Sequence, residues 1–184
     1  MKLMIASDLH GSSYYCKKVL DTFRQEQADR LLLLGDILYH GPRNDLPKDY
    51  DPKAVITMLN ENKDSLFCVR GICDTEVEQM VLEFPILADY SIITLGKRLM
   101  YATHGHKFTP QNLPLKEGDI YIQGHTHVPR CTTTDKGVLW LNPGSVSIPK
   151  ENSHHQYMIY ENGVFEWKDL AGCVLHTLEI DIHQ

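Results

Sequence analysis

Residues 31–36 read Leu31-Leu32-Leu33-Leu34-Gly35-Asp36, an apolar run that stops at a glycine and a carboxylate. A continuous run of this kind is typical of a strand that is buried on both faces. Two other runs have the same form and also end in polar residues, at 3–7 and 66–69. The segments that follow the three runs carry apolar residues at helical spacing. Ser12 or Ser13 can cap the first of these helices, and Asp51-Pro52 looks like the cap and first turn of the second. The first half therefore predicts strand, loop and helix three times in succession, as in an α/β layer.

The second half of the chain has a different pattern, with short apolar runs joined by turn residues. Asn162-Gly163, between two of these runs, is a strong hairpin signal. The predicted hairpins are 90–95 with 98–103, 130–134 with 138–141 and 157–160 with 164–167, and single strands are predicted at 120–123 and 173–182. This half is therefore predicted to be mostly antiparallel. Two sheets packed face to face, with helices outside, accommodate both halves in one domain, residues 1–184.

The composition excludes several classes of protein. The chain has 184 residues, of which 42% are hydrophobic and 23% charged, and this is typical of a globular domain rather than a disordered, collagenous or coiled-coil chain. A formal net charge of −6 makes nucleic acid an unfavourable partner. The five cysteines lack CxxC spacing, and neither a signal sequence nor a membrane-spanning stretch is visible. We therefore expect a cytoplasmic protein with reduced thiols and no membrane partner.

Five polar clusters each follow a predicted strand, at 8–10, 35–36, 71–74, 103–106 and 124–127. Ligands bind beyond the carboxyl ends of the strands in α/β sheets, so the clusters are expected to converge on one crevice. Their aspartates and histidines would be costly to hold together without a counter-charge. A pair of divalent metal ions supplies it. Mixed carboxylate and imidazole ligation suits Mn, Fe, Ni or Zn, and the absence of thiolate ligands argues against a structural zinc site.

The order and spacing of these motifs resemble those of the calcineurin-like metallophosphoesterase family. The motifs are Asp8-x-His10, Gly35-Asp36, Gly71-x-Cys73-Asp74, His104-Gly105 and Gly124-His125-x-His127. Residues 35–44 and 142–149 resemble the small bacterial YfcE-type phosphodiesterases of that family. The resemblance implies an α/β fold, a four-layer α-β-β-α sandwich of two mixed sheets flanked by helices. It also implies hydrolysis of a phosphomonoester or phosphodiester, commonly with manganese.

The resemblance also assigns metal ligands by position. Two divalent ions, Mn²⁺ or else Ni, Co, Fe or Zn, would be held by six residues: Asp8, His10 and His127 on the first, His104 and His125 on the second, and Asp36 bridging both. Two ions about 3.5–4 Å apart would activate a bridging hydroxide and clamp the phosphoryl oxygens for in-line displacement. The implied enzyme is a hydrolase, a metal-dependent phosphodiesterase that acts on a small phosphodiester.

Two positions depart from the pattern of active relatives. Those relatives carry a metal-ligating asparagine where this chain has Ile72, which predicts weaker, partial occupancy of the second metal site. Many of them have a catalytic histidine where this chain has Cys73, and a thiol is a poor proton donor to a leaving alkoxide. In the loop after Asp36, Arg43 could hold a phosphate by bidentate hydrogen bonds, and His40 could serve as the acid.

Several alternatives stay open at this point. His106 could be a ligand in place of His104, Cys73 could be a small buried filler, and His40 and Arg43 could lie in a solvated loop. The chain could be an impaired enzyme or a non-catalytic interaction scaffold, because the vacuolar-sorting subunit of the retromer coat resembles this fold and lacks the same asparagine. The chain retains six of the seven ligand positions, which favours an enzyme. A homodimer or tetramer is expected, since exposed strands in this fold often pair.

Overall fold

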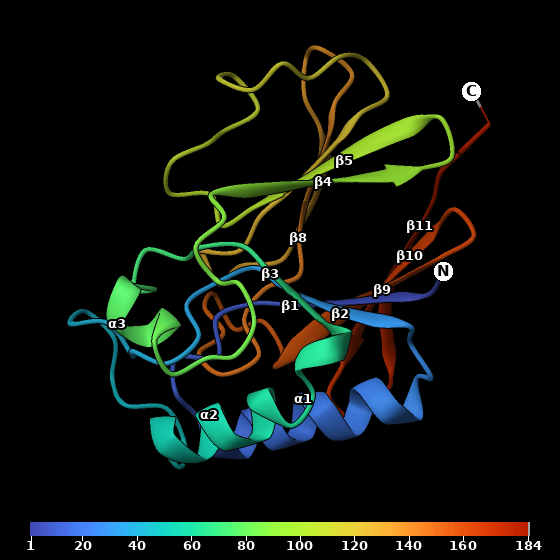
Figure 1. The fold of residues 1–184 in the computed structure, drawn as a ribbon. Helices are drawn as coiled ribbons and strands as arrows, with labels where there is room; N and C mark the ends of the chain where they lie inside the picture. Colours follow the sequence, from blue (N-terminus) through green and yellow to red (C-terminus); the bar gives the residue numbers. More distant parts are fainter. Residues whose placement is uncertain (184) are drawn as a thin grey trace.

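The computed structural model describes residues 1–183 and folds them into two mixed β-sheets that pack face to face (Figure 1). The strands are β1 (Leu3–Ala6), β2 (Arg30–Leu33), β3 (Leu66–Cys68), β4 (Tyr90–Leu95), β5 (Arg98–Thr103), β6 (Ile120–Ile122), β7 (Arg130–Thr133), β8 (Leu139–Asn142), β9 (Gln156–Glu161), β10 (Val164–Asp169) and β11 (Val174–Glu179). The helices are α1 (Ser13–Gln25), α2 (Pro52–Asn60) and α3 (Glu76–Gln79), with a 3₁₀ turn η1 (Lys63–Ser65). Gln184, the last residue of the predicted domain, lies outside the described residues.

The two sheets confirm the predicted α/β class with two mixed sheets. The first has the order β11-β10-β9-β1-β2-β3, in which β1, β2 and β3 are parallel and the last three strands of the chain are antiparallel. The second has the order β4-β5-β6-β8-β7. Its outer pairs are the predicted hairpins, but β5 with β6 and β6 with β8 are parallel. The antiparallel prediction for the second half therefore misses two central pairs, because hairpin signals report only on neighbours along the chain.

Two apolar clusters explain why β1 has no polar residues. On β1, Leu3 and Ile5 face the second sheet, while Met4 and Ala6 face the helices, and all four are fully buried. Successive side chains of a strand point to opposite faces, so a sheet covered on both sides needs apolar residues at every position.

Helices α1 and α2 lie side by side against the outer face of the six-stranded sheet (Figure 1). Ser12 caps α1 by accepting a hydrogen bond from the Tyr15 amide at 3.2 Å, and Asp51 caps α2 by accepting one from the Ala54 amide at 3.1 Å. Pro52 occupies the first helical position, where its missing N–H has no cost. These are the caps that the sequence predicts.

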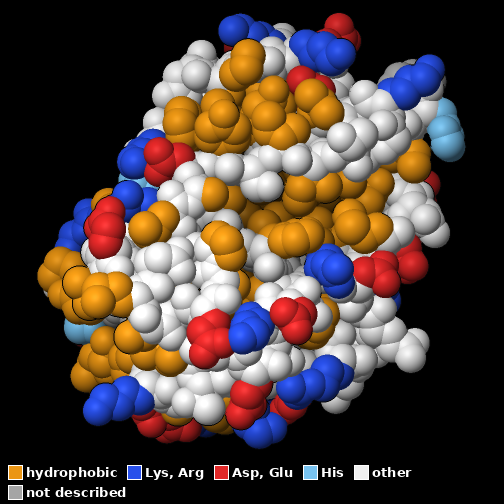
Figure 2. All heavy atoms as spheres, in the orientation of Figure 1, with side chains coloured by type: hydrophobic (Ala, Val, Ile, Leu, Met, Phe, Trp, Pro, Cys, Tyr) orange, Lys and Arg blue, Asp and Glu red, His pale blue; other side chains and the backbone are white. Residues whose placement is uncertain are grey.

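The outer face of the five-stranded sheet is covered differently. Within residues 1–183, the connection from β5 to β6 contains no helix, and it crosses this face as a loop. Tyr121 on β6 donates to the carbonyl of Phe108 in that loop at 2.6 Å, and Tyr90 on β4 packs edge-on against the Phe108 ring. Tyr90 and Ile92 stay nearly half exposed, and Figure 2 has hydrophobic side chains over this part of the surface.

Helix α3 confirms the predicted short helix after β3, but its apolar residues point to solvent. Val77 is 72% exposed and Met80, just after the helix, is 84% exposed. Figure 2 shows a group of hydrophobic side chains at this edge of the molecule. Along the part of the chain that the structure describes, none of the helices combines the length and the apolar character needed to cross a membrane.

Candidate metal centre

All five polar clusters begin at the carboxyl ends of strands, as predicted. They follow β1, β2 and β3 of the first sheet and β5 and β6 of the second. Main-chain hydrogen bonds connect these loops: the Asp8 amide donates to Gly35 at 3.2 Å, and the Gly124 amide donates to His104 at 3.1 Å. The His125 amide, which follows β6 of the second sheet, donates to Asp8 Oδ2 of the first sheet at 3.2 Å. The two sheets therefore contribute to one site at their common edge.

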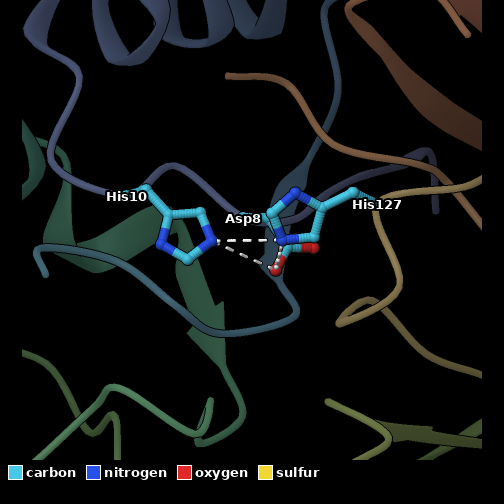
Figure 3. Close-up of side chains that lie close together, drawn as sticks. All are labelled: Asp8, His10 and His127. Atoms are coloured by element: carbon cyan, nitrogen blue, oxygen red, sulfur yellow. Dashed lines mark hydrogen bonds and ion pairs between the residues drawn. The ribbon is translucent and has the colours of Figure 1, made fainter. Parts of the chain in front are cut away.

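Asp8, His10 and His127 form the first group of candidate ligands (Figure 3). Asp8 Oδ1 lies 3.7 Å from His10 Nε2 and 3.3 Å from His127 Nε2, and the two nitrogens are 3.2 Å apart. The residues are almost completely buried. Atoms at these separations can all ligate one ion at ordinary metal–ligand distances.

Hydrogen bonds on the far side of each imidazole fix the direction of its lone pair. Nδ1 of His10 donates to the Tyr39 carbonyl at 2.9 Å, Nδ1 of His127 to Ile148 at 2.7 Å, and Nδ1 of His104 to Leu34 at 2.6 Å. A carbonyl can only accept, so each Nδ1 carries the hydrogen, and the neutral ring offers its Nε2 lone pair. All three Nε2 atoms face carboxylates. Metal-binding histidines in proteins are held in this way.

Asp36 and His104 form the second part of the site. Asp36 Oδ2 lies 3.4 Å from His104 Nε2 and 3.7 Å from His10 Nε2, which places it between the two groups. Asp8 Oδ1 and His104 Nε2 are buried and have no hydrogen-bond partner among the described residues. Buried polar atoms in native proteins are nearly always paired, so these two orphaned atoms fit the ligand set of a divalent ion.

His125 lies beside this second group but outside the ligand clusters of the described residues. Its ring centroid is 5.1 Å from that of His104, and its amide donates to Asp8 Oδ2 at 3.2 Å. Its ring lines the open cavity above the carboxylates. His104 rather than His106 faces Asp36: His104 Nε2 lies 3.4 Å from Asp36 Oδ2, whereas His106 belongs to none of the ligand clusters found among the described residues.

Five of the six candidate ligands adopt the left-handed backbone conformation that favours glycine. The φ angles are 61° at Asp8, 49° at His10, 56° at Asp36, 65° at His125 and 61° at His127. Each such residue costs about 1 kcal/mol or more, and such strain clusters at ligand-binding sites, where the surroundings hold it in place. Gly124, which lies between β6 and His125 along the chain, has no room for a side chain, because a Cβ there would meet Ser7 Oγ at 1.9 Å.

The charges at the site depend strongly on one another. Burial opposes ionisation of Asp8, but contact with His127 and the charge of His104 outweigh it and hold the pKa of Asp8 well below its ordinary range. Burial also opposes protonation of His104, but contact with Asp36 and the charge of Asp8 outweigh it and raise the pKa of His104 to about 9. The carboxylates therefore stay ionised and require positive charge beside them.

Metal binding is expected to release about one proton per protein at pH 7.5, because a metal on His104 Nε2 displaces the proton that the raised pKa of about 9 keeps there. The apparent affinity should rise with pH, up to about tenfold per pH unit below 9. The stability of the metal-free protein depends on pH in the opposite direction. Protonated His104 stabilises the fold, and this contribution is lost as pH rises from 6.5 through about 9. Calorimetric titration in buffers of different ionisation enthalpy measures the release, and its absence would remove His104 from the ligand set.

A cavity of about 610 Å³ opens onto four of the candidate ligands: His10, Asp36, His125 and His127. Three of the candidates outside the ligand set line it, namely Arg43, Ile72 and Cys73. Ile72 is half exposed and offers no donor atom, and Cys73 Sγ lies within 4.8 Å of ligand atoms of His10 and Asp36. Burial, then the charges of Asp36 and Asp74, raise the pKa of Cys73 to about 12, so its thiol stays protonated.

His40 is not among the residues that line this cavity. Its ring packs edge-on against Tyr39 and Tyr50, and its buried Nδ1 has no partner in the described chain. The structure thus separates His40 from Arg43, although the two are close in sequence. Lys150 and Tyr39 line the cavity without having been predicted, because neither belongs to a motif of metal-binding side chains.

Asp74 is the residue whose structural role the sequence does not reveal. Its fully buried carboxylate accepts three main-chain hydrogen bonds, from Asp36 at 2.9 Å, Ile37 at 2.9 Å and Gly71 at 2.7 Å. It thereby joins the loop after β2 to the loop after β3 and holds Asp36 in its strained conformation. The space between the loops is narrow, since a Cβ on Gly71 would meet Asp36 Oδ1 at 2.2 Å.

Replacing Asp74 with alanine should lower the free energy of unfolding by about 3 kcal/mol or more, because three buried N–H groups lose their acceptor. Asp74→Asn should be milder, since its amide oxygen can still accept from Asp36 and Gly71. Urea denaturation followed by circular dichroism measures both. A loss below about 0.5 kcal/mol for Asp74→Ala, the range of an ordinary surface substitution, would contradict this role.

The chain is similar to proteins of one family. The sequence profile of the calcineurin-like phosphoesterase superfamily domain matches residues 1–163. Phosphodiesterase YfcE of Escherichia coli K12 is 47% identical over 165 residues, which cover 89% of both chains. A solved structure of the phosphoesterase Yfce from E. coli superposes with a TM-score of 0.93 at 43% identity, over 98% of this chain and 100% of that one.

A more distant protein shares the fold alone. Wild-type Vps29 of Entamoeba histolytica, solved in complex with zinc, superposes with a TM-score of 0.59 at 19% identity and covers 99% of each chain. The same architecture therefore occurs in proteins with different names, and the activity has to be argued from the residues of the site.

Proposed function

This chain belongs to the calcineurin-like phosphoesterase superfamily, and we propose that it is a metal-dependent phosphodiesterase that acts on a small organic phosphodiester. The similarity to phosphodiesterase YfcE over 89% of the chain supports the reaction class. The cavity of about 610 Å³ is of a size that takes a small molecule, and the net charge of −6 disfavours a long nucleic acid.

The observation that carries the proposal is the common orientation of His10, His104 and His127. Each donates through Nδ1 to a main-chain carbonyl and presents Nε2 to Asp8 or Asp36. Ring nitrogens and carboxylate oxygens that face one another in a buried site form the ligand set of a cation.

The six residues divide into the two sets proposed above: Asp8, His10 and His127 hold a first ion, His104 and His125 a second, and Asp36 lies between them. When bound, two divalent ions stabilise charge on the phosphoryl oxygens and lower the pKa of water for attack at neutral pH. Mn²⁺ is the proposed metal, because carboxylate and imidazole ligands suit it, with Ni, Co, Fe or Zn as alternatives.

The remaining cavity residues bind and orient the substrate. Arg43 can donate two parallel hydrogen bonds to a phosphate or carboxylate group of the substrate. The protonated Cys73 thiol is a weak donor beside Asp36. Among the described residues that line the cavity, every imidazole is a proposed metal ligand, and the position of His40 argues against the role of general acid. A leaving group that departs as a stable anion, such as an aryl oxide, is therefore favoured.

One observation favours a second candidate function, a weakly active or inactive chain that serves as an interaction scaffold. Ile72 stands in the cavity beside Asp36 and Cys73 and contributes no ligand. The proposed second ion then has Asp36, His104 and His125 as its protein ligands, and we expect it to bind more weakly than the first.

Hydrolysis of bis(p-nitrophenyl) phosphate by the purified chain tests the proposal. Turnover is expected with Mn²⁺ and is expected to disappear with EDTA, because the phosphoryl group then loses its cationic partners. Metal content is measured in the same samples. If Mn, Ni, Co and Zn all bind but none supports turnover, the scaffold function replaces the enzyme. If none of them binds, the metal centre itself is wrong.

A further inference from the structure

We infer that the cavity has a subsite for a second anionic group of the substrate, formed by Lys150 and Arg43 beside the metal centre. The inference rests on the proposed function and specifies its substrate class: a phosphodiester with an additional carboxylate or phosphate on one ester arm. Both side chains line the cavity, and they are its cationic residues.

Lys150 is held at the cavity by main-chain contacts with the loop that carries His127, a proposed ligand of the first ion. Its amide donates to the carbonyl of His127 at 3.2 Å, and the Ile148 carbonyl two residues earlier accepts from His127 Nδ1 at 2.7 Å. On the other side, the Lys150 carbonyl accepts from both the amide and the hydroxyl of Ser153, at 3.0 and 2.6 Å. The position of Lys150 is therefore coupled to that of a metal ligand, which a cation on a free surface loop would not be.

Arg43 is held in the corresponding way next to His10. The Tyr39 carbonyl accepts from His10 Nδ1 at 2.9 Å, and the loop from His40 to Asn44 is closed by the Asn44 side chain, which donates to the His40 carbonyl at 2.8 Å. Lys150 and Arg43 thus come from two loops that are each anchored on a first-metal histidine, and those histidines are in contact.

The two cations have no counter-charge from the protein. Across residues 1–183, neither forms an ion pair, although Asp45 and Glu151 are near in sequence. A single scissile phosphate carries one negative charge, which the proposed metals already neutralise. Two further unpaired cations in the cavity of an acidic protein therefore favour a substrate with additional negative charge.

A matched pair of ligands tests the subsite without requiring turnover. The 4-carboxybutyl and n-pentyl monoesters of methylphosphonic acid have the same length and differ by one negative charge. We expect the Mn²⁺-loaded protein to bind the carboxylate ligand about five- to tenfold more tightly in calorimetric titration at low salt, since each exposed charge pair contributes little alone. The preference should shrink in 0.5 M NaCl, because the charges are exposed.

Charge-reversal variants test whether Lys150 and Arg43 produce the preference for the carboxylate ligand. Lys150→Glu and Arg43→Glu should each abolish or invert the preference, whereas Lys150→Arg should keep it. Lys53→Glu, at an exposed position of α2 outside the cavity, makes the same change in net charge and should leave the preference intact. Equal affinity for the two ligands, no binding of either, or a preference that survives Lys150→Glu would overturn the subsite. Absence of bis(p-nitrophenyl) phosphate turnover by the unmodified, Mn²⁺-loaded protein would instead count against the proposed function.

Discussion

Asp36→Asn is expected to reduce turnover of bis(p-nitrophenyl) phosphate by about three orders of magnitude, or about 4 kcal/mol of transition-state stabilisation. The substituted amide keeps an oxygen for the hydrogen bond from the Cys73 amide, which is 2.8 Å long in the native protein. Its NH₂ group, however, would face His10 and His104 in place of the carboxylate oxygen that lies 3.7 and 3.4 Å from them. The substitution removes charge from both proposed metal positions at once.

The same variant is expected to fold normally. Asn tolerates the left-handed conformation that Asp36 adopts with φ of 56°. Asp36→Ala should lose turnover equally, but it also removes the acceptor for Cys73 and should be less stable. Thermal unfolding and metal content of both variants separate the two effects. An Asp36→Asn protein that keeps two bound ions and a tenth or more of native turnover would contradict the role of this carboxylate.

Ile72→Asn is expected to raise the affinity for the second divalent ion about tenfold or more, which corresponds to about 1.4 kcal/mol or more of binding free energy. Position 72 lines the cavity next to Asp36, and an amide oxygen there adds a hard ligand where isoleucine offers none. Turnover at limiting Mn²⁺ should rise in parallel. The native side chain is 51% exposed, so the fold should lose little stability.

Ile72→Ala is the matched control, since it opens the cavity without adding a ligand. If alanine raises turnover as much as asparagine does, isoleucine obstructs the substrate rather than weakening the metal site. If the native chain already binds two ions with equal affinity, and asparagine changes neither affinity nor rate, the account of Ile72 is wrong.

Much of the fold follows from local sequence. Uninterrupted apolar runs give β1 and β2, and the caps Ser12 and Asp51 begin α1 and α2 as predicted. The spacing of apolar residues along a strand or helix reports directly on which of its side chains are buried. The parallel pairs of the second sheet do not follow in the same way, because a long loop separates β5 from β6 and strand β7 lies between β6 and β8 along the chain, so neither pair has a local signal of its register. The exposure of the apolar residues on α3 could not be predicted either, since an apolar pattern does not reveal whether another part of the protein covers it.

The candidate site was predictable as a list of side chains but not as a geometry. The positions of Asp8 and Asp36 after strands mark them as candidates, and the family resemblance adds His104, with His106 as its alternative. The orientation of each imidazole depends on main-chain carbonyls distant in sequence, such as Leu34 for His104. The role of Asp74 depends on three amides from two loops. The exclusion of His40 from the cavity depends on its packing against Tyr50.

Anomalous scattering from crystals grown with Mn²⁺ tests the metal centre most directly. We predict a strong peak enclosed by Asp8, His10 and His127, and a weaker one beside Asp36, His104 and His125 that strengthens in Ile72→Asn. Crystals in which manganese binds only elsewhere, while these side chains keep their orientation, would contradict the proposed metal centre.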